Sequence, residues 1–351
     1  MGSEIEPEVV TQADVARQAG VSRAIVSYVL NNGPRKVSDE TRSRVLTAIQ
    51  ELGYRPNKHA QRLKMGADAA QNSIGIIAGG KGYNLLERPY YSAILASLFD
   101  RAHYLNQHIR FFTFFEALED PVFFNRNVHR EEISSLILLL PAAILDHPQH
   151  EKIMAQILER IDNIICLERS IYNLPALILD LAAAAEMAVE HLIGLGHQRI
   201  GFLSLEDERL EGYRRALGMH NILFDESLVF VVDGGQILSS GYEQTLNLLK
   251  TRPPITALFA SNDEGAVAAI AAIRDSGLDV PNDIAIASID NTEIARMARP
   301  ALTTVNVPRR DMVDYALHYL LSQREHPVLS PPSIILPIEL VVRESSGAKR
   351  R

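Results

Sequence analysis

The sequence predicts an α/β protein with a small all-α headpiece and two doubly wound parallel-sheet lobes. Its 351 residues exceed one typical domain, and 47% of them are hydrophobic at a mean hydropathy near zero, as in a globular protein with a sizeable core. Residues 9–66 carry helix signals and many basic side chains. From Ser73 onward, apolar runs of strand length alternate with amphipathic stretches of helix length, and this series occurs twice.

The charge is divided unevenly along the chain. Residues 9–66 contain ten Lys or Arg and four Asp or Glu, a net charge of +6, whereas the whole chain has −8, so the remainder carries −14. A basic head on an acidic body indicates that only the head meets a polyanion. A solvated charged face is the alternative when charge is considered alone.

Two short helices open the headpiece. We expect Thr11 to cap the first helix, with Asp14 as the returning carboxylate of a capping box and Gly20 as a left-handed stop. Ser22 is the expected cap of the second helix. The buried side of this helix is made by Ile25, Val26 and either Val29 or Leu30. Two helices joined by so short a glycine-bearing turn form a helix-turn-helix.

A third helix is predicted to close on the first two. Ser38 is its expected cap and Gly53 its stop. Its core stripe consists of Val45, Ile49 and Leu52.

The first turn of the second helix has the chemistry to read DNA. In the major groove, Arg23 can pair with guanine O6 and N7, and Ala24 can admit a thymine methyl group. Three helices that serve only as a scaffold are the alternative. Ser27 and Tyr28 lie on or near the same side of the second helix.

A second DNA contact is predicted directly after the headpiece. A short helix from Asn57 to about Lys64 is too short to be stable alone, so it is expected to form only when docked. Lys58 and Arg62 are cationic, and Leu63 is the apolar side chain that could wedge between base steps in the minor groove. A frayed linker is the alternative.

The body reads as two similar α/β lobes. Continuous apolar strands between amphipathic helices predict parallel sheets that are covered on both faces. The predicted strands of the first series are "SIGIIAGG", "IRFFTFF", "SSLILLLP", "NIICLER" and "ALILDL", and those of the second are "RIGFLSL", "LVFVVDG", "ALFASND" and "IAIASID". The helices expected between them include 91–106, 147–161, 182–195, 208–220, 240–251 and 264–276.

Motifs of catalysis are missing from the sequence. It has no G-x-S-x-G, no P-loop, no G-x-G-x-x-G after a strand and no His/Cys metal spacing, so no catalytic residue, cofactor or metal site is predicted. Cys166, the one cysteine, is expected to be a buried structural thiol. An acidic N-terminus without an apolar signal core and the absence of an 18-residue apolar run favour a cytoplasmic, nucleoid-associated protein without membrane contact.

Along nearly its whole length the sequence resembles the lactose-repressor (LacI/GalR) family of bacterial transcription regulators. The matching stretches are "DVARQAGVSRAIVSYVLN", "VSDETRSRVLTAIQELGYRPN", "HLIGLGHQRIGFL", "RLEGYRRAL", "SNDEGAVAAI", "GLDVPNDIAIASID", "PALTTVNVP" and "ELVVRESS". The resemblance implies a helix-turn-helix headpiece, a hinge helix and two lobes of the type I periplasmic-binding-protein kind. It also implies dimers on pseudo-palindromic operators and a small effector bound between the lobes. The headpiece residues that it places at DNA are Ser22, Arg23, Ala24, Ser27, Tyr28 and Asn31.

The resemblance places the domain boundaries as follows. The chain is expected to cross between the lobes near Leu179, Asn306 and Pro331. The implied domains are a headpiece at 9–56, a hinge helix and linker at 57–72, an N-terminal lobe at 73–178 plus 306–331, and a C-terminal lobe at 179–305 plus 332–346.

An effector site is also implied by the resemblance. Its residues would be Tyr90, Tyr91, Arg209, Gln236, Asn262 and Asp290, a set that suits a sugar or another hydroxyl-rich ligand. Gln236 departs from the aromatic residue that often stacks on a sugar, so a less polar effector is the alternative. Ion pairs are the alternative role for Arg209 and Asp290.

The expected function is that of an allosteric repressor of transcription, with a transcriptional activator as the lesser alternative. A solute-binding protein built from the same two lobes is disfavoured by the basic head and by the missing signal core. An enzyme on this scaffold is disfavoured by the absent motifs. No leucine heptads follow "VVRESS", so a homodimer is expected rather than a tetramer.

Overall fold

The computed structural model describes residues 10–31, 37–54, 72–80, 82–234, 236–251, 254–325 and 333–348. The chain divides into two compact units. The first comprises Met1–Gly80, Phe99–Ala176 and Ala316–Pro332, and the second comprises Lys81–Leu98, Leu177–Tyr315 and Ser333–Arg351. Helices α6 (Pro89–Tyr104) and α15 (Arg309–Glu325) therefore each have residues in both units.

The headpiece has the three predicted helices, α1 (Gln12–Ala19), α2 (Arg23–Asn31) and α3 (Asp39–Leu52). The predicted capping box between Thr11 and Asp14 is present, and Gly20 ends α1 in the left-handed conformation at φ 65°. The Ser38 side chain caps α3 and Gly53 ends it, both as predicted. These local signals place the three helices around one apolar cluster, whose fully buried members include Val15, Val26, Val45 and Ile49.

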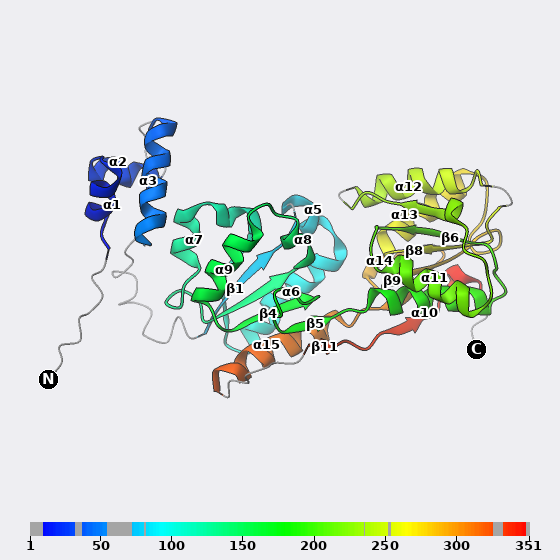
Figure 1. The fold of residues 1–351 in the computed structure, drawn as a ribbon. Coiled ribbons are helices and arrows are strands. Elements are labelled where there is room, and N and C mark those ends of the chain that lie inside the picture. The colour runs from blue at the N-terminus through cyan, green and yellow to red at the C-terminus, as the bar shows by residue number, and fades with distance from the viewer. Residues whose placement is uncertain are drawn as a thin grey trace. The chain divides into compact units, whose positions relative to one another are not determined.

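The first sheet has six strands in the order β11-β5-β4-β3-β1-β2. Four of them, β1, β4, β5 and β11, are labelled in Figure 1. The strands are β1 (Ser73–Ala78), β2 (His108–Phe114), β3 (Ser135–Leu139), β4 (Ile164–Glu168), β5 (Ala176–Ile178) and β11 (Ile334–Ile335). All residues of β1 and β3 are buried, as expected for parallel strands with helices on both faces. The elements between them include η2 (Phe115–Glu119), α7 (Pro121–Asn127), α8 (Ala142–Leu145) and α9 (His150–Arg160).

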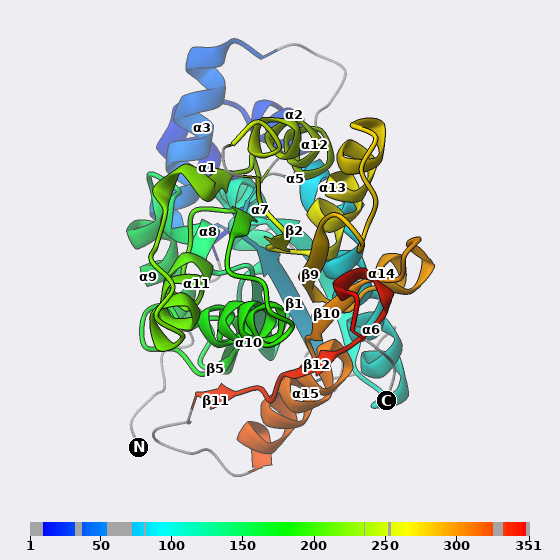
Figure 2. The same cartoon turned by 90° about the vertical axis from the view of Figure 1, so that its right-hand side faces the viewer.

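The second sheet has the order β12-β10-β9-β8-β6-β7. Its strands are β6 (Ile200–Ser204), β7 (Val229–Val231), β8 (Ala257–Ala260), β9 (Ala285–Asp290), β10 (Thr303–Asn306) and β12 (Glu339–Val341). They are parallel except for β12, which runs antiparallel to β10. Figure 2 shows β9 and β10 side by side.

Two pairs of helices cover this second sheet. Helices α10 (Leu181–Gly194) and α11 (Arg209–Met219) pack together, and so do α12 (Ile237–Leu248) and α13 (Asp263–Asp275). The two pairs lie on opposite faces of the sheet (Figure 1). Shorter elements complete the second unit: α5 (Gly82–Glu87), η3 (Glu226–Leu228), α14 (Glu293–Met297) and η4 (Glu344–Ser346).

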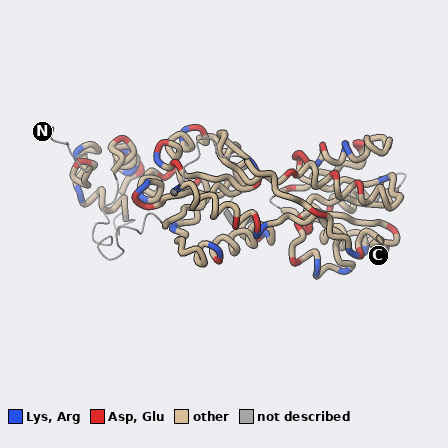
Figure 3. The backbone as a smooth tube through the Cα atoms, turned by 90° about the horizontal axis from the view of Figure 1, so that it is seen from below, with Lys and Arg blue, Asp and Glu red and all other residues tan. Residues whose placement is uncertain are grey.

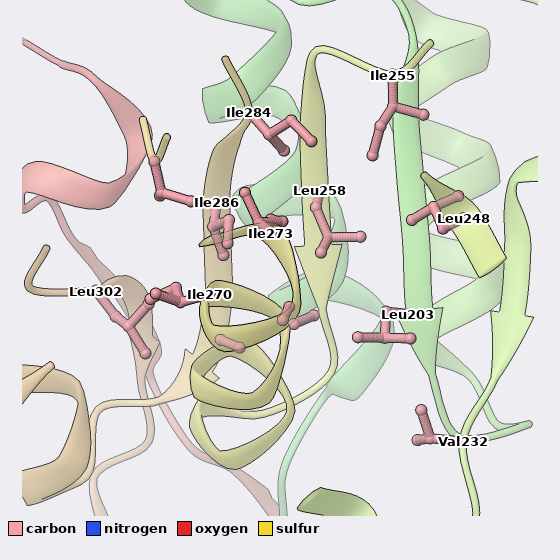
Figure 4. Close-up of a cluster of buried hydrophobic side chains, with 14 of the residues drawn as sticks. Leu203, Val232, Leu248, Ile255, Leu258, Ile270, Ile273, Ile284, Ile286 and Leu302 are labelled. Atoms are coloured by element: carbon pink, nitrogen blue, oxygen red, sulfur yellow. The ribbon is translucent and has the colours of Figure 1, made fainter. Parts of the chain in front are cut away.

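The core beneath α13 is aliphatic. Figure 4 shows side chains from the strands and from α13 converging there, among them Leu258, Ile270 and Ile286. Burial of such side chains stabilises the fold by about 1.5–3 kcal/mol each. The strands are fixed by their packing in this core, and so are the positions of the polar residues that follow the strands.

The third crossing of the chain is expected near Pro331, which lies outside the described residues. Ile334 and Ile335 form β11, which pairs with β5 in the first sheet, whereas β12 belongs to the second sheet. The boundary between the two compact units falls between Pro332 and Ser333, so the expected C-terminal-lobe segment 332–346 stays a prediction.

The single thiol is structural. Cys166 is fully buried in β4, as predicted, and burial raises its pKa to about 12. The thiolate, which is the reactive form, is therefore scarce at neutral pH. Among the helices that the structure describes, none is long and apolar enough to span a membrane.

Candidate functional site

The first turn of α2 presents the predicted DNA readers. Ser22, Arg23 and Ala24 are exposed, while Val26 and Val29 on the opposite side are buried in the headpiece cluster. The backbone N–H of Ile25 donates to the Ser22 hydroxyl at 3.4 Å, so Ser22 lies at the start of the helix as predicted. A helix anchored on one side and exposed at its N-terminal turn is the arrangement that enters a major groove.

The other predicted DNA residues are less exposed or lie outside the described chain. Ser27 and Tyr28 are half-buried on the same helix, and Asn31 is its last residue. The segment with Lys58, Arg62 and Leu63 lies outside the described residues.

The described helices of the headpiece do not themselves carry the basic excess. Residues 10–31 and 37–54 hold four Arg and four Asp or Glu (Figure 3). The other six cations of the head fall in 32–36 and 55–71, outside the described residues. Arg17 is 79% exposed and pairs with Asp14 at 3.1 Å. Most of the positive charge of the head therefore belongs to those two segments of the sequence.

A second group of polar residues gathers at the carboxyl edge of the second sheet. Asn262 lies two residues after β8, Asp290 ends β9, and Arg209 opens α11 after β6. The chain turns from β6 to β7 on one side and later to β8 on the other, so the topological switch point lies between β6 and β8. Ligand sites of open α/β sheets form at this edge and this point.

Asp290 is buried and has an unusual backbone. Asp290 is only 6% exposed, and its φ of 113° lies outside the normal range of a non-glycine residue. Burial, together with the negative charge of Asp263, raises the pKa of Asp290 well above its usual range, and Arg209, Arg88 and Arg309 oppose the shift. Among the described residues its carboxylate has no ion-pair partner within 4 Å, whereas Arg209 does form an ion pair, with Asp207.

Arg209 and Asn262 each have one polar atom satisfied and one unsatisfied. Arg209 pairs with Asp207 at 2.5 Å, and the Oδ1 atom of Asn262 accepts a hydrogen bond from the N–H of Gly265 at 2.8 Å, which caps α13. Within the described part of the chain, Nε of Arg209 and Nδ2 of Asn262 are buried without an acceptor. Because a buried unsatisfied donor costs about 1–3 kcal/mol, a bound oxygen atom is the natural partner of both.

The hydroxyl of Ser204 adds a third buried polar atom, again without a partner among the described residues. Ser204 ends β6, directly beside the strand that leads to Asn262. The sequence reasoning did not single it out, because one serine after an apolar run carries no distinctive signal.

The two predicted tyrosines pack against arginines. Tyr90 and Tyr91 are 4% and 6% exposed, and their rings meet edge to face at 4.9 Å. The Arg88 guanidinium lies 5.1 Å from the centroid of the Tyr91 ring and also pairs with Glu264 at 3.4 Å. Burial raises the pKa of Glu264, and the charge of Arg88 opposes this. Arg88 and Glu264 were not predicted, because residues so far apart in the sequence give no local pattern.

Gln236 stands apart from this group. It is exposed at the start of α12, and its described contacts are local, with the Ser239 hydroxyl and the Ser240 N–H. Of the six predicted effector residues, five are buried in the second unit, and Gln236 is exposed. The buried five are Tyr90, Tyr91, Arg209, Asn262 and Asp290. Among the described residues, no three His, Cys, Asp or Glu side chains gather in a way that could hold a metal ion.

Comparison with known proteins agrees with this architecture. Residues 11–57 match the model for bacterial regulatory proteins of the lacI family, and residues 189–346 match that for the periplasmic binding protein-like domain. The transcriptional regulator DegA of Bacillus subtilis is 31% identical over 342 residues, which are 95% of this chain and 97% of DegA.

Two solved structures extend the likeness to three dimensions. The transcriptional regulator CelR in complex with cellobiose has a TM-score of 0.68 at 26% identity, covering 96% of this chain and 99% of its own. The lac repressor dimer bound to operator and the anti-inducer ONPF has a TM-score of 0.66 at 28% identity, covering 97% and 99%. With a headpiece that presents one helix and two lobes of parallel sheet, the chain belongs to the lacI family of bacterial regulatory proteins and is a DNA-binding transcriptional regulator.

Proposed function

We propose that this regulator is a repressor that binds a pseudo-palindromic operator as a homodimer and is controlled by a small hydroxyl-rich effector. The observation that carries the DNA part is the exposed first turn of α2, where Ser22, Arg23 and Ala24 project from a helix whose other side is buried. In this reading Arg23 pairs with a guanine and Ala24 contacts a thymine methyl group. Ser27, Tyr28 and Asn31 would add further contacts from the same helix, and Lys58, Arg62 and Leu63 would serve the minor groove.

The effector site is proposed at the carboxyl edge of the second sheet. Asn262 Nδ2 and Arg209 Nε offer two buried donors, and the Asp290 carboxyl group offers acceptors. Alternating donors and acceptors suit the hydroxyl groups of a sugar, and the relative CelR was solved with cellobiose. Tyr90 and Tyr91 would line this site, and Gln236 would contact the effector only at its periphery.

The charges of the site favour an uncharged effector. Arg88 is paired with Glu264 and Arg209 with Asp207. Arg309 donates to the backbone carbonyl groups of Asp290 and Asn291. Since the charge of each guanidinium is already met by a carboxylate or by carbonyl groups, a phosphorylated or carboxylated ligand would gain little beyond the remaining Nε donor of Arg209 unless it broke one of these pairs.

We further propose that the protein acts in the cytoplasm and binds its effector without converting it. The relatives are transcriptional regulators, and the described site contains no nucleophile paired with a base. Control would then arise from differential affinity of the effector for two states of the protein. To change operator occupancy from nearly complete to nearly none, this difference must reach about 5 kcal/mol.

DNA binding is tested by fluorescence anisotropy with promoter fragments from the protein's own genomic neighbourhood and with a scrambled duplex, at two salt concentrations. Arg23→Ala should weaken operator binding by about 1–3 kcal/mol and leave the scrambled duplex nearly unchanged. The matched control is Arg17→Ala, which removes the same charge from exposed α1 and should affect both duplexes alike. Equal losses on both duplexes for Arg23→Ala would refute base reading by this residue.

The effector is sought by a thermal-shift screen of neutral sugars, polyols, nucleobases and phosphorylated sugars. A ligand at about 100 times its Kd stabilises the folded state by about 2.7 kcal/mol, which raises the melting temperature. A shift by cellobiose or another neutral sugar, and none by glucose 6-phosphate, is the expected pattern. A response confined to phosphorylated compounds would overturn the proposal of an uncharged effector.

A further inference from the structure

The turn after β9 has an uncommon backbone conformation. Asp290 has φ 113° and Asn291 has φ 52°, and neither is a glycine. Two consecutive residues with positive φ persist only where surrounding contacts hold them. The contacts of this turn therefore decide where the Asp290 carboxyl group lies.

Arg309 makes two of these contacts with one guanidinium. Its Nη1 donates to the carbonyl oxygen of Asp290, and its Nη2 donates to that of Asn291 at 3.0 Å. The planar fork of an arginine can reach two neighbouring carbonyl groups at once, which the single ammonium group of a lysine does poorly. Arg309 thus binds the backbone on both sides of the peptide that joins the two residues.

The same guanidinium also reaches the aromatic side of the site. It lies 5.8 Å from the centroid of the Tyr90 ring, at the outer range of a cation–π contact. Tyr90 in turn meets Tyr91, whose ring lies beneath Arg88. Arg309 therefore contacts both the Asp290 turn and Tyr90.

We propose that Arg309 is a positioning residue of the effector site, which fixes the Asp290 turn and Tyr90 in the arrangement that binds the effector. The proposal deepens the proposed function, because it takes Asp290 and Tyr90 as effector contacts. Arg309 acts through these residues rather than by touching the effector. Its charge is directed at backbone carbonyl groups and a ring, and not at the aliphatic core that stabilises the lobe.

The neighbouring residue provides a matched control. Arg310 lies in the same first turn of α15 and is exposed. Arg309→Met and Arg310→Met remove the same charge from adjacent positions while keeping an unbranched side chain. Arg309→Lys keeps the positive charge near Tyr90 but cannot donate to both carbonyl groups at once. If Arg309→Met does not fold, Arg309→Lys can be measured in its place.

The first measurement needs no effector. Hydrogen–deuterium exchange of the backbone amides of Asn291 and Thr292 should be faster in Arg309→Met by about tenfold or more, intermediate in Arg309→Lys and unchanged in Arg310→Met. A second readout separates positioning from general loosening. The carboxyl resonance of Asp290, identified by its absence in Asp290→Asn, should titrate at higher pH in Arg309→Met, because a cation has been removed, and at the wild-type pH in Arg310→Met.

The third measurement is the affinity for cellobiose by calorimetry, or for the neutral sugar that gives a thermal shift if cellobiose gives none. It should fall about tenfold or more in Arg309→Met, while operator affinity without sugar stays at the wild-type value. If no sugar binds the wild-type protein, the proposed effector class fails, and the exchange and titration results still decide the role of Arg309. Equal exchange and equal Asp290 titration in the two methionine variants would overturn the proposal.

Discussion

Asp263 accepts hydrogen bonds from both the backbone N–H and the hydroxyl group of Thr292, at 2.7 and 2.8 Å. Its other oxygen accepts from the hydroxyl groups of Ser288 and Thr304, both at 2.8 Å. A fully buried carboxylate in the first turn of α13 is thus bound by donors from β9, from the following turn and from β10. Asp263 therefore connects the elements on which the proposed effector site lies.

We expect Asp263→Ala to lower the free energy of unfolding by about 3 kcal/mol or more, because four donors lose a charged acceptor and most of them are buried. Urea unfolding followed by circular dichroism measures this change. Asp275→Ala, at the exposed end of the same helix, is the control and should stay within about 0.5 kcal/mol. Similar losses in the two variants would show that the buried network contributes little.

The elevated pKa of Asp290 predicts a pH dependence of stability. Its folded-state pKa lies above the unfolded value of about 3.9, so the stability that this group contributes is fully present below that value and is lost as pH rises through the folded-state pKa. Asp290→Asn, which resembles the neutral carboxyl group, should therefore be more stable than wild type at pH 7. The difference should shrink toward pH 4.

Urea unfolding of both proteins between pH 4 and pH 8 measures this difference, with Asp275→Asn as the exposed control. A constant offset between wild type and Asp290→Asn across the range would contradict a raised pKa at this position.

The headpiece could be predicted from the sequence because its signals are local. Thr11 and Asp14 are three residues apart, and Gly20 directly follows the helix that it ends. The strands could also be predicted from the sequence, because strands such as β1 and β3 are largely apolar runs and are buried along their whole length. The positions of Asn262 and Asp290 at the carboxyl edge of the second sheet could be predicted because the first follows a predictable strand and the second ends one.

The remaining features depend on long-range contacts. Arg88 and Glu264 are 176 positions apart, and neither carries a pattern that points to the other. β11 pairs with β5 through Ile335, which is 65% exposed. The sequence of β11 therefore has no buried hydrophobic face from which the pairing could be predicted. Such contacts follow from the route of the chain, which local propensity does not encode.

A glycine determines how closely α10 and α11 approach. A Cβ atom added at Gly212 would lie 1.9 Å from the carbonyl oxygen of Ala182, which is backbone and has little room to move. Gly212→Ala should therefore destabilise the protein by about 1–3 kcal/mol. Gly218→Ala, on the same helix with open space around it, should be neutral or stabilising by up to about 1 kcal/mol. Thermal unfolding of both variants measures this, and a destabilised Gly218→Ala alongside an unaffected Gly212→Ala would contradict the close packing.

Asn262 has two roles that substitutions can separate. Its Oδ1 atom caps α13, whereas its buried Nδ2 atom has no acceptor among the described residues and is proposed to meet the effector. Serine is as good a cap as asparagine but lacks that amide donor, so Asn262→Ser should keep most of the stability and lose the thermal shift by the effector sugar. Asn262→Ala should lose the shift and, in addition, about 1 kcal/mol of stability with the cap.

Comparison of these two variants with and without the sugar distinguishes the roles, because the cap affects only the baseline melting temperature. A serine variant that still responds fully to the sugar would leave Asn262 with its capping role alone. In that case the effector would have to be held through Arg209 and Asp290, and Arg209→Met would be expected to remove the response that Asn262→Ser had left intact.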